Sequence, residues 1–165
     1  MKIKKSIEKA LNDQIRMELS SAYTYLSMAA YFERRAFNGF AQWMRLQREE
    51  EHGHAMRFYD YLHDRDGRVE LQAIDKPEHD FSSPLDVFER SLAQEREVTA
   101  SIHSLYDLAV KEKDHATVSM LKWFVDEQVE EEKSVQDMVD RLKLAGDHPG
   151  ALLILDKEAG QRHTE

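Results

Sequence analysis

The sequence contains no cysteine. This absence excludes disulfide frameworks, thiolate zinc sites and catalysis by a thiol, so any metal must be held by oxygen and nitrogen ligands. Glycine and proline are also scarce, with 6 and 3 residues among 165, which excludes collagen-like and low-complexity chains. The longest wholly aliphatic run, Ala151 to Leu155, is far shorter than the ~20 residues that span a bilayer. A globular, helical protein without a membrane-spanning segment is expected.

Positive charge is in short supply as well. The chain has 32 acidic residues against 23 Lys and Arg, giving a formal net charge of -9, and no basic stripe stands out that could follow a phosphate backbone. Nucleic acid is therefore not an expected partner. Residues 1–5 are basic, but Ser6 to Asn12 mixes polar and apolar side chains where a signal peptide needs an unbroken apolar stretch, so a cytoplasmic protein is expected.

Apolar residues recur at spacings of three and four along most of the chain, which is typical of amphipathic helices. Asn38 and Gly39 are expected to close the first helix and Gly67 to stop the second, while Ser83 and Asp114 are expected to cap the third and fourth. The prediction is a single all-α domain over residues 1–165, a four-helix bundle over about 4–145 with helices near 4–37, 39–66, 83–113 and 115–145, and a short fifth helix near 149–158.

The connection between the second and third helices is unusually long. About sixteen residues, from Gly67 to Ser82, lack helical periodicity and include Pro77, whereas neighbouring helices are usually joined by a handful. Such a crossover can run the length of the bundle and make the third helix parallel to the second. With that topology, the acidic residues described next lie at heights that agree within roughly 8 Å along the bundle.

Each long helix carries ionisable or polar residues on its apolar stripe. A lone ionised carboxylate in a core costs several kcal/mol, so four of them at one height require a compensating cation or abundant water. A Glu run or a single Glu-x-x-His is by itself typical of a solvent-exposed helix surface; the specificity lies in the constellation. Hard oxygen ligands with one imidazole suit Fe, Mn or a mismatched Zn, and the dinuclear carboxylate arrangement in a four-helix core favours iron. The residues are Glu18, Glu51, His54, Glu95, Gln128 and Glu131.

These motifs resemble the bacterial non-haem ferritins over nearly the whole chain. The resemblance extends to the closing segment from Leu144 to Glu158. Bacterioferritins and rubrerythrins carry a second Glu-x-x-His in the last bundle helix, where this chain has Gln128-x-x-Glu131, and the haem-ligating Met of bacterioferritins is replaced by His52 and Gly53, so no haem is expected. The motifs are Glu18, the Glu50, Glu51, His54 cluster, Glu95, and Glu127, Gln128, Glu130 and Glu131 within Trp123 to Lys133.

The resemblance implies specific roles for these residues. Glu51 would bridge two irons, and Tyr25 and Trp123 match aromatics that can supply an extra electron, with ordinary core packing as the alternative. Glu49 is expected to be an exposed neighbour, and Gly53 indicates close approach of a neighbouring helix. The implied ligands are Glu18, Glu51 and His54 for one iron, Glu51, Glu95 and Glu131 with Gln128 nearby for the second, and Glu50, Glu127, Glu130 and Glu131 for a third, weaker site facing a cage interior.

The function that the resemblance implies is iron storage. Fe(II) would be oxidised by O2 or H2O2 at the di-iron ferroxidase centre and stored as hydrated ferric oxide inside a hollow homo-oligomeric shell of 24 subunits. The short fifth helix would pack either on the end of its own bundle or, as the resemblance favours, at a symmetry axis of the shell. Two alternatives remain: a small di-iron peroxidase or oxidase of rubrerythrin or bacterioferritin type, and a purely structural bundle.

Overall fold

The computed structural model describes residues 2–162, so the first residue and residues 163–165 of the expected domain lie outside the described part. Within residues 2–162 the chain forms helices and no strands, which confirms the expected all-α fold class. The helices are α1 (Lys5–Glu33), α2 (Asn38–Asp64), α3 (Pro84–Lys111), α4 (His115–Ala145) and the short α5 (Pro149–Ala159).

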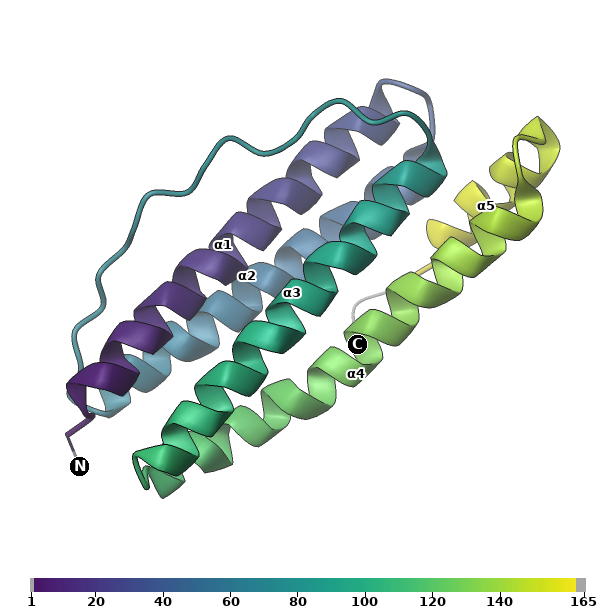
Figure 1. Ribbon diagram of the computed structural model, residues 1–165. Helices are drawn as coiled ribbons and strands as arrows, with labels where there is room; N and C mark the ends of the chain where they lie inside the picture. Colours follow the sequence, from purple (N-terminus) through teal and green to yellow (C-terminus); the bar gives the residue numbers. More distant parts are fainter. Residues whose placement is uncertain (1, 163–165) are drawn as a thin grey trace.

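The four long helices lie side by side, and the segment between α2 and α3 runs the length of the bundle (Figure 1). Consequently α3 runs parallel to α2, while α1 and α4 run in the opposite direction. The crossover is fastened to α1 by hydrogen bonds. The Asn12 amide donates to the carbonyl of Arg68 (2.9 Å) and accepts from the backbone N–H of Glu70 (2.7 Å), and the Ser27 hydroxyl donates to the carbonyl of Glu78 (2.6 Å).

The chain reversal between α1 and α2 differs from the expectation. Helix α1 ends at Glu33 rather than near Phe37, because Ala36 adopts a left-handed conformation (φ 60°) that breaks the helical hydrogen bonding. Asn38 and Gly39 do not close the first helix; they form the first turn of α2. The expectation was wrong because both residue types are good helix stops, and nothing local reveals that Gly39 is needed for a tertiary contact.

The other helix ends follow the residue types more closely. The side chains of Ser83 and Asp114 accept the backbone N–H groups of Asp86 and Thr117, each at 3.1 Å, and so cap α3 and α4 as expected. At the end of α2, however, the left-handed residue is Asp66 (φ 51°) rather than Gly67. The expected caps therefore form at the starts of α3 and α4, whereas the left-handed residue at the end of α2 is one position earlier than expected.

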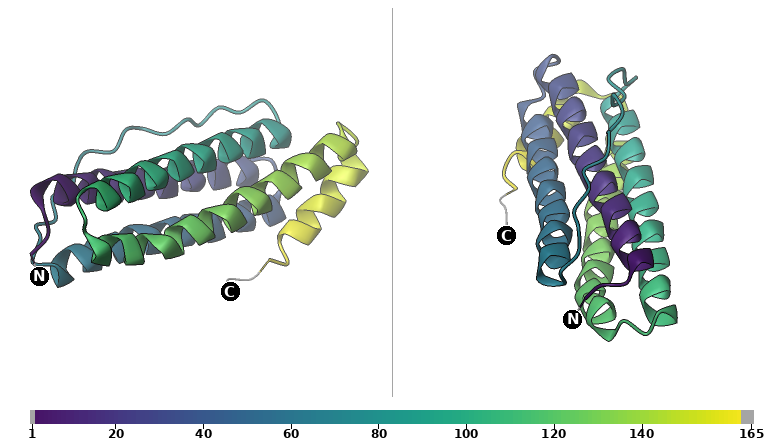
Figure 2. Two further views of the ribbon diagram at one scale, coloured as in Figure 1. Left: turned by 60° about the horizontal axis from the view of Figure 1, so that its bottom comes forward. Right: turned by 90° about the vertical axis from the view of Figure 1, so that its left-hand side faces the viewer.

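Helix α5 packs on the end of its own bundle, beside α4 and the start of α2 (Figure 2). No side chain of α2 itself caps its N-terminus; instead, the Asp156 carboxylate of α5 accepts the Phe40 backbone N–H (2.8 Å), where the helix dipole favours a negative charge. Leu155 is buried in this contact, whereas Leu153 and Ile154 remain 58% and 61% exposed. One apolar face of the helix is thus covered and the other is open.

The buried apolar residues form two clusters at opposite ends of the bundle. One is centred on Phe32, Phe40 and Phe88, and the other contains the stacked rings of Phe58 and Phe124, whose centroids are 4.0 Å apart. The layer between them is occupied by buried polar side chains. Such a layer interrupts the core of a small bundle only if something compensates for the desolvated charges.

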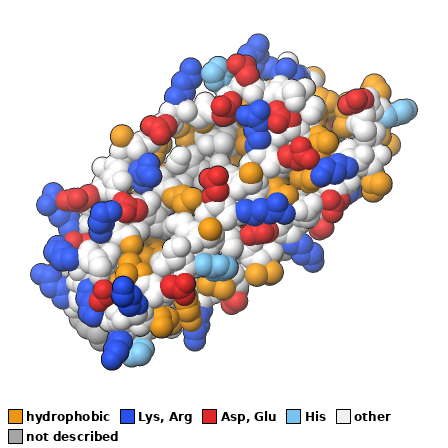
Figure 3. All heavy atoms as spheres, viewed as in Figure 1, with side chains coloured by type: hydrophobic (Ala, Val, Ile, Leu, Met, Phe, Trp, Pro, Cys, Tyr) orange, Lys and Arg blue, Asp and Glu red, His pale blue; other side chains and the backbone are white. Residues whose placement is uncertain are grey.

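The surface viewed in Figure 3 carries Lys and Arg interspersed with Asp and Glu rather than a continuous stripe of one sign. Among residues 2–162, none of the helices combines the length and the apolar character that crossing a membrane requires.

Candidate metal centre

The layer between the two clusters brings together the side chains that the sequence singles out, from all four long helices. On one side of it, His54 Nδ1 lies 3.4 Å from a Glu51 oxygen and 3.9 Å from a Glu18 oxygen, and one ligand atom from each of these three residues lies within 4.8 Å of the others. Each of the six side chains is at most 5% exposed, namely Glu18, Glu51, His54, Glu95, Gln128 and Glu131.

Several ligand atoms in this layer have no hydrogen-bond partner. They are one oxygen of Glu18, both oxygens of Glu51 and Nδ1 of His54. A buried polar atom without a partner costs about 1–3 kcal/mol, and more when it is charged. Four such atoms converging on one space fit a bound cation, which would satisfy all of them at once, and their chemistry of carboxylate oxygen with one imidazole suits iron.

The other side of the layer is more fully hydrogen-bonded. The Tyr25 hydroxyl donates to Glu95, and its oxygen accepts from the Ser91 hydroxyl at 2.8 Å. The Gln128 amide lies 3.4 Å from a Glu95 oxygen, and the Gln47 amide donates to a Glu131 oxygen at 2.9 Å. These donors orient the two carboxyl groups and bring no positive charge of their own, so they do not compete with a metal ion for the charge of the layer.

Burial raises the pKa of three carboxyl groups in the layer, those of Glu51, Glu95 and Glu131. The pKa of Glu51 is well above its usual range because of desolvation and then because of the charges of Glu95 and Glu18. Burial likewise raises the pKa of Glu95. The pKa of Glu131 is raised to about 8, first by burial and then by the charge of Glu95. The pKa of Tyr25 is also well above its usual range, so its hydroxyl remains a donor. In the absence of a cation the layer therefore holds extra protons at neutral pH.

These shifts predict how the metal-free protein responds to pH. The folded chain binds more protons than the unfolded chain between the ordinary glutamate value of 4.5 and about 8, so the stability that these groups contribute is greatest below 4.5 and is lost as the pH rises towards 8. We expect the free energy of unfolding, measured by urea titration in chelator, to fall between pH 5.5 and pH 8. The Glu131→Gln variant should fall less steeply; an equal slope in both proteins would contradict the assignment.

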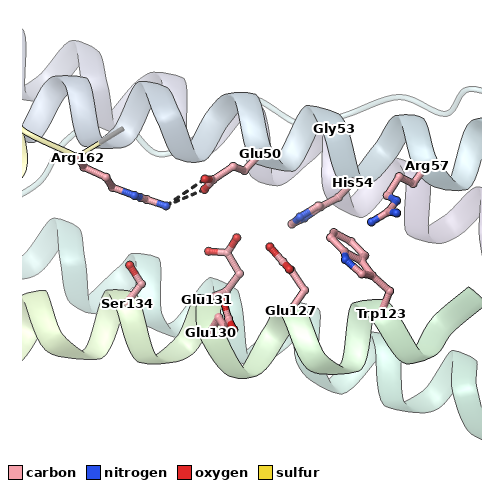
Figure 4. Close-up of a pocket in the computed structure, with 10 residues that line it drawn as sticks. All are labelled: Glu50, Gly53, His54, Arg57, Trp123, Glu127, Glu130, Glu131, Ser134 and Arg162. Atoms are coloured by element: carbon pink, nitrogen blue, oxygen red, sulfur yellow. Dashed lines mark hydrogen bonds and ion pairs between the residues drawn. The ribbon is translucent and has the colours of Figure 1, made fainter. Parts of the chain in front are cut away.

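A hollow of about 610 Å³ opens beside the layer, between α2 and α4 (Figure 4). Glu50, Glu127 and Glu130, which the resemblance assigns to a third site, line it together with Glu131. His54, Glu127 and Glu131 offer a second set of ligand atoms within 4.8 Å of one another. The buried layer and the hollow are therefore continuous, with His54 and Glu131 at their boundary.

Trp123 stands at one end of the hollow and is 36% exposed, so it is not an ordinary core residue. Its ring lies edge-on to His54 at 5.5 Å, and the guanidinium of Arg57 sits 3.7 Å above it. Gly53 also lines the hollow. The expected close helix approach at this glycine is wrong, because a Cβ there would meet nothing within 4 Å.

Some side chains of the site escape sequence reasoning. The amide of Gln14 donates to the Glu18 oxygen at 2.8 Å, as Gln47 does to Glu131. Both glutamines are buried and lie one turn before a predicted ligand, Glu18 and Glu51, so a polar residue at that stripe position is a signal that can find them. Arg162, which also lines the hollow, follows the last helix and offers no such periodicity.

Comparison with known proteins gives concordant results. Residues 8–145 match the ferritin-like domain family. The bacterial non-heme ferritins of Staphylococcus aureus and Staphylococcus epidermidis are each 41% identical over 160 residues, which cover 97% of this chain and 96% of those proteins. Among solved structures, the open-pore ferritin of Archaeoglobus fulgidus has 47% identity and a TM-score of 0.96, with 98% of this chain and 99% of that chain covered.

An engineered closed form of the Archaeoglobus ferritin superposes with a TM-score of 0.97 and covers 99% of both chains. The domain match spans all four long helices, and the identities extend over nearly the full length. The chain therefore belongs to the ferritin family and is similar to the bacterial non-haem ferritins.

Proposed function

We propose that this chain oxidises Fe(II) at the buried layer and stores the product as ferric mineral. Its family and fold support iron storage in general. The observation that carries the ferroxidase step is the group of four unpartnered, buried ligand atoms on Glu18, Glu51 and His54. A structural bundle has no reason to keep these atoms desolvated, because each one lowers its stability.

The ligand sets predicted from the sequence remain the assignment. Glu18 and His54 hold the first iron, Glu95 and Glu131 hold the second, and Glu51 bridges the two. Support for the bridge comes from its position, since neither oxygen of Glu51 has a hydrogen-bond partner and its pKa responds to charges on both sides, those of Glu18 and Glu95.

Hard anionic ligands stabilise Fe(III) more than Fe(II), so binding in this layer makes each iron easier to oxidise. Two adjacent Fe(II) ions give up one electron each. One O2 then takes both electrons with two protons and leaves as H2O2, or one H2O2 takes them with two protons and leaves as two waters. The Tyr25 hydroxyl, hydrogen-bonded to Glu95, holds a further proton and electron next to the second iron.

The hollow provides the exit for the product. Storage requires Fe(III) to leave the centre, and the ligands assigned to the second iron are carboxylates with the Gln128 amide nearby, without an imidazole of their own. Glu127 and Glu131 continue into the hollow, where Glu50 and Glu130 complete the weaker third site. A gradient of ligands from buried to half-exposed allows the ion to pass from one set to the next.

The proposed assembly is a hollow shell of 24 copies in the cytoplasm. Its support is the open apolar face of α5, Leu153 and Ile154, together with Leu144, which is 89% exposed in the last turn of α4. Exposed apolar residues grouped at one end of a molecule are typical of an interface. The archaeal relative is described as an open-pore ferritin, which is consistent with a hollow assembly.

Aerobic addition of Fe(II) followed by gel filtration tests the proposal. Storage predicts that hundreds of irons stay with a particle far larger than one chain, whereas a peroxidase or oxidase predicts turnover with about two irons per chain. A structural bundle predicts neither. Elution as a small particle with no retained iron would overturn the shell and storage, and no Fe(II) oxidation above the protein-free rate would overturn the ferroxidase.

A further inference from the structure

The chain returns to the candidate metal centre after its last helix. Three residues beyond the end of α5, the Arg162 side chain enters the hollow and pairs with Glu50, with Nη2 3.1 Å and 2.9 Å from the two carboxylate oxygens (Figure 4). Its other terminal nitrogen, Nη1, donates to the side-chain oxygen Oε1 of Gln47, and the guanidinium carbon lies 4.8 Å from the centre of the Trp43 ring. The guanidinium thus has three partners, all on α2.

The first contact places a fixed positive charge where a metal ion is expected. Glu50 belongs to the predicted third site, and Arg162 uses both of its carboxylate oxygens. An oxygen engaged by a guanidinium presents its lone pair to N–H groups rather than to a metal. Glu50 therefore joins the third site only when Arg162 withdraws.

The second contact reaches the buried layer through an amide. A guanidinium can only donate hydrogen bonds, so the Gln47 oxygen must face Arg162 and its NH2 group must face Glu131. The amide of Gln47 cannot turn over while Arg162 is in place. Arg162 therefore positions Glu131, a predicted ligand of the second iron, without touching it.

We propose that Arg162 is an internal, tethered cation that occupies the third site until iron displaces it. The proposal rests on the proposed ferroxidase function and assigns to this residue the control of the order in which the sites fill. With Arg162 docked, Glu131 is aligned for the buried pair and the third site lacks Glu50. When a divalent ion enters among Glu127, Glu130 and Glu131, its charge repels the guanidinium and competes for Glu50.

The docked arginine is held weakly enough to leave. The side chains of Arg162 and Glu50 are partly open to solvent, at 24% and 26% exposed, so water screens their attraction and can hydrate the guanidinium when it withdraws. The short segment from Gly160 to Arg162 connects the guanidinium to α5. Withdrawal of Arg162 thus requires no change in the four-helix bundle.

Zinc binding tests the proposal without any oxidation, because Zn²⁺ is not redox-active. Calorimetric titration of the metal-free protein with Zn²⁺ is expected to resolve two tight ions and a weaker third ion per chain. In Arg162→Ala, and in Arg162→Gln, which keeps more of the side-chain volume, the third ion should bind about tenfold more tightly, within the usual range of coupling between two sites. Arg162→Lys keeps the charge but loses the planar fork, so it should lie between the wild type and Arg162→Ala.

Arg141→Ala is the matched control. It removes one arginine that also contacts the α5 region, through Glu158, but that does not line the hollow, so the third affinity should stay at the wild-type value. In a Glu50→Gln background, removing Arg162 should strengthen binding of the third ion less than it does in the wild type, because the two residues act as a pair.

The outcomes separate the two hypotheses. If the wild type binds two tight ions and Arg162→Ala and Arg162→Gln leave the third affinity unchanged, or no third ion binds, the role of Arg162 is wrong and the ferroxidase centre stands. If no variant and no wild-type sample binds zinc tightly, the proposed centre itself fails. Circular dichroism of each variant confirms that the helices are intact.

Discussion

Replacing Glu51 by glutamine is expected to slow the oxidation of Fe(II) at least about 100-fold while leaving the fold intact. Glu51 interacts with both halves of the layer, because the charges of Glu95 on one side and Glu18 on the other raise its pKa, and His54 Nδ1 lies 3.4 Å from one of its oxygens. Glutamine keeps the shape of the side chain but brings an NH2 group that cannot ligate a metal. The two irons then lose their common ligand. Stopped-flow absorbance after mixing with Fe(II) in air measures the rate.

Stability provides the second measurement for this variant. In the metal-free protein Glu51 carries two unpartnered buried oxygens, so glutamine should not lower the free energy of unfolding in chelator. Glu49→Gln is the matched control, because Glu49 is the exposed neighbour that pairs with Arg48 and does not enter the layer. Rapid oxidation in Glu51→Gln, or equally slow oxidation in Glu49→Gln, would remove Glu51 from its proposed role.

Local sequence signals predicted much of the architecture, and the reason is that they coincide with tertiary demands. Ser83 and Asp114 cap helices because each is a good cap at the point where an amphipathic stripe begins. The crossover was recognisable because its periodicity fails and Pro77 interrupts it. The end of α1 was misplaced because the left-handed residue is Ala36, a residue type that seldom marks a helix end.

The candidate site was predictable to the extent that its residues interrupt an apolar stripe. Glu18, Glu95 and Glu131 are visible in this way, since each stands where a core residue is expected. That they bind iron remains a prediction. Arg162 was not predictable, because its position depends on how α5 folds back onto α2, and no periodic pattern connects a residue beyond the last helix with Glu50.

Two glycines illustrate the same limit. Gly39 and Gly53 both lie in α2, and glycine in a helix costs about 1 kcal/mol relative to alanine at either place. Gly53 lies next to open space, so the fold of one subunit does not require it. Gly39 faces α5 so closely that a Cβ would lie 1.6 Å from the carbonyl oxygen of Asp156. The sequence shows two similar glycines, and only the packing separates them.

Replacing Gly39 by alanine is therefore expected to displace α5. The clash is with the backbone of α5, which cannot rotate away as a side chain can. The backbones are also close at Gly160, where an added Cβ would lie 3.0 Å from the Gly39 Cα, so α5 cannot slide along the contact to relieve the clash. Displacement removes the Asp156 cap from the N-terminus of α2 and exposes Leu155. Overpacking typically costs about 1–3 kcal/mol, and the loss of a cap adds about 1 kcal/mol. Thermal unfolding followed by circular dichroism measures the loss.

The same variant bears on the proposed shell. If α5 carries a subunit contact through Leu153 and Ile154, its displacement should convert the large particle into smaller species in gel filtration. Gly53→Ala is the matched control in the same helix, and it should be as stable as the wild type or up to about 1 kcal/mol more stable, with unchanged particle size. A Gly39→Ala protein that unfolds and elutes like the wild type would show that α5 is not held against α2, and the placement of Arg162 in the hollow would lose its support.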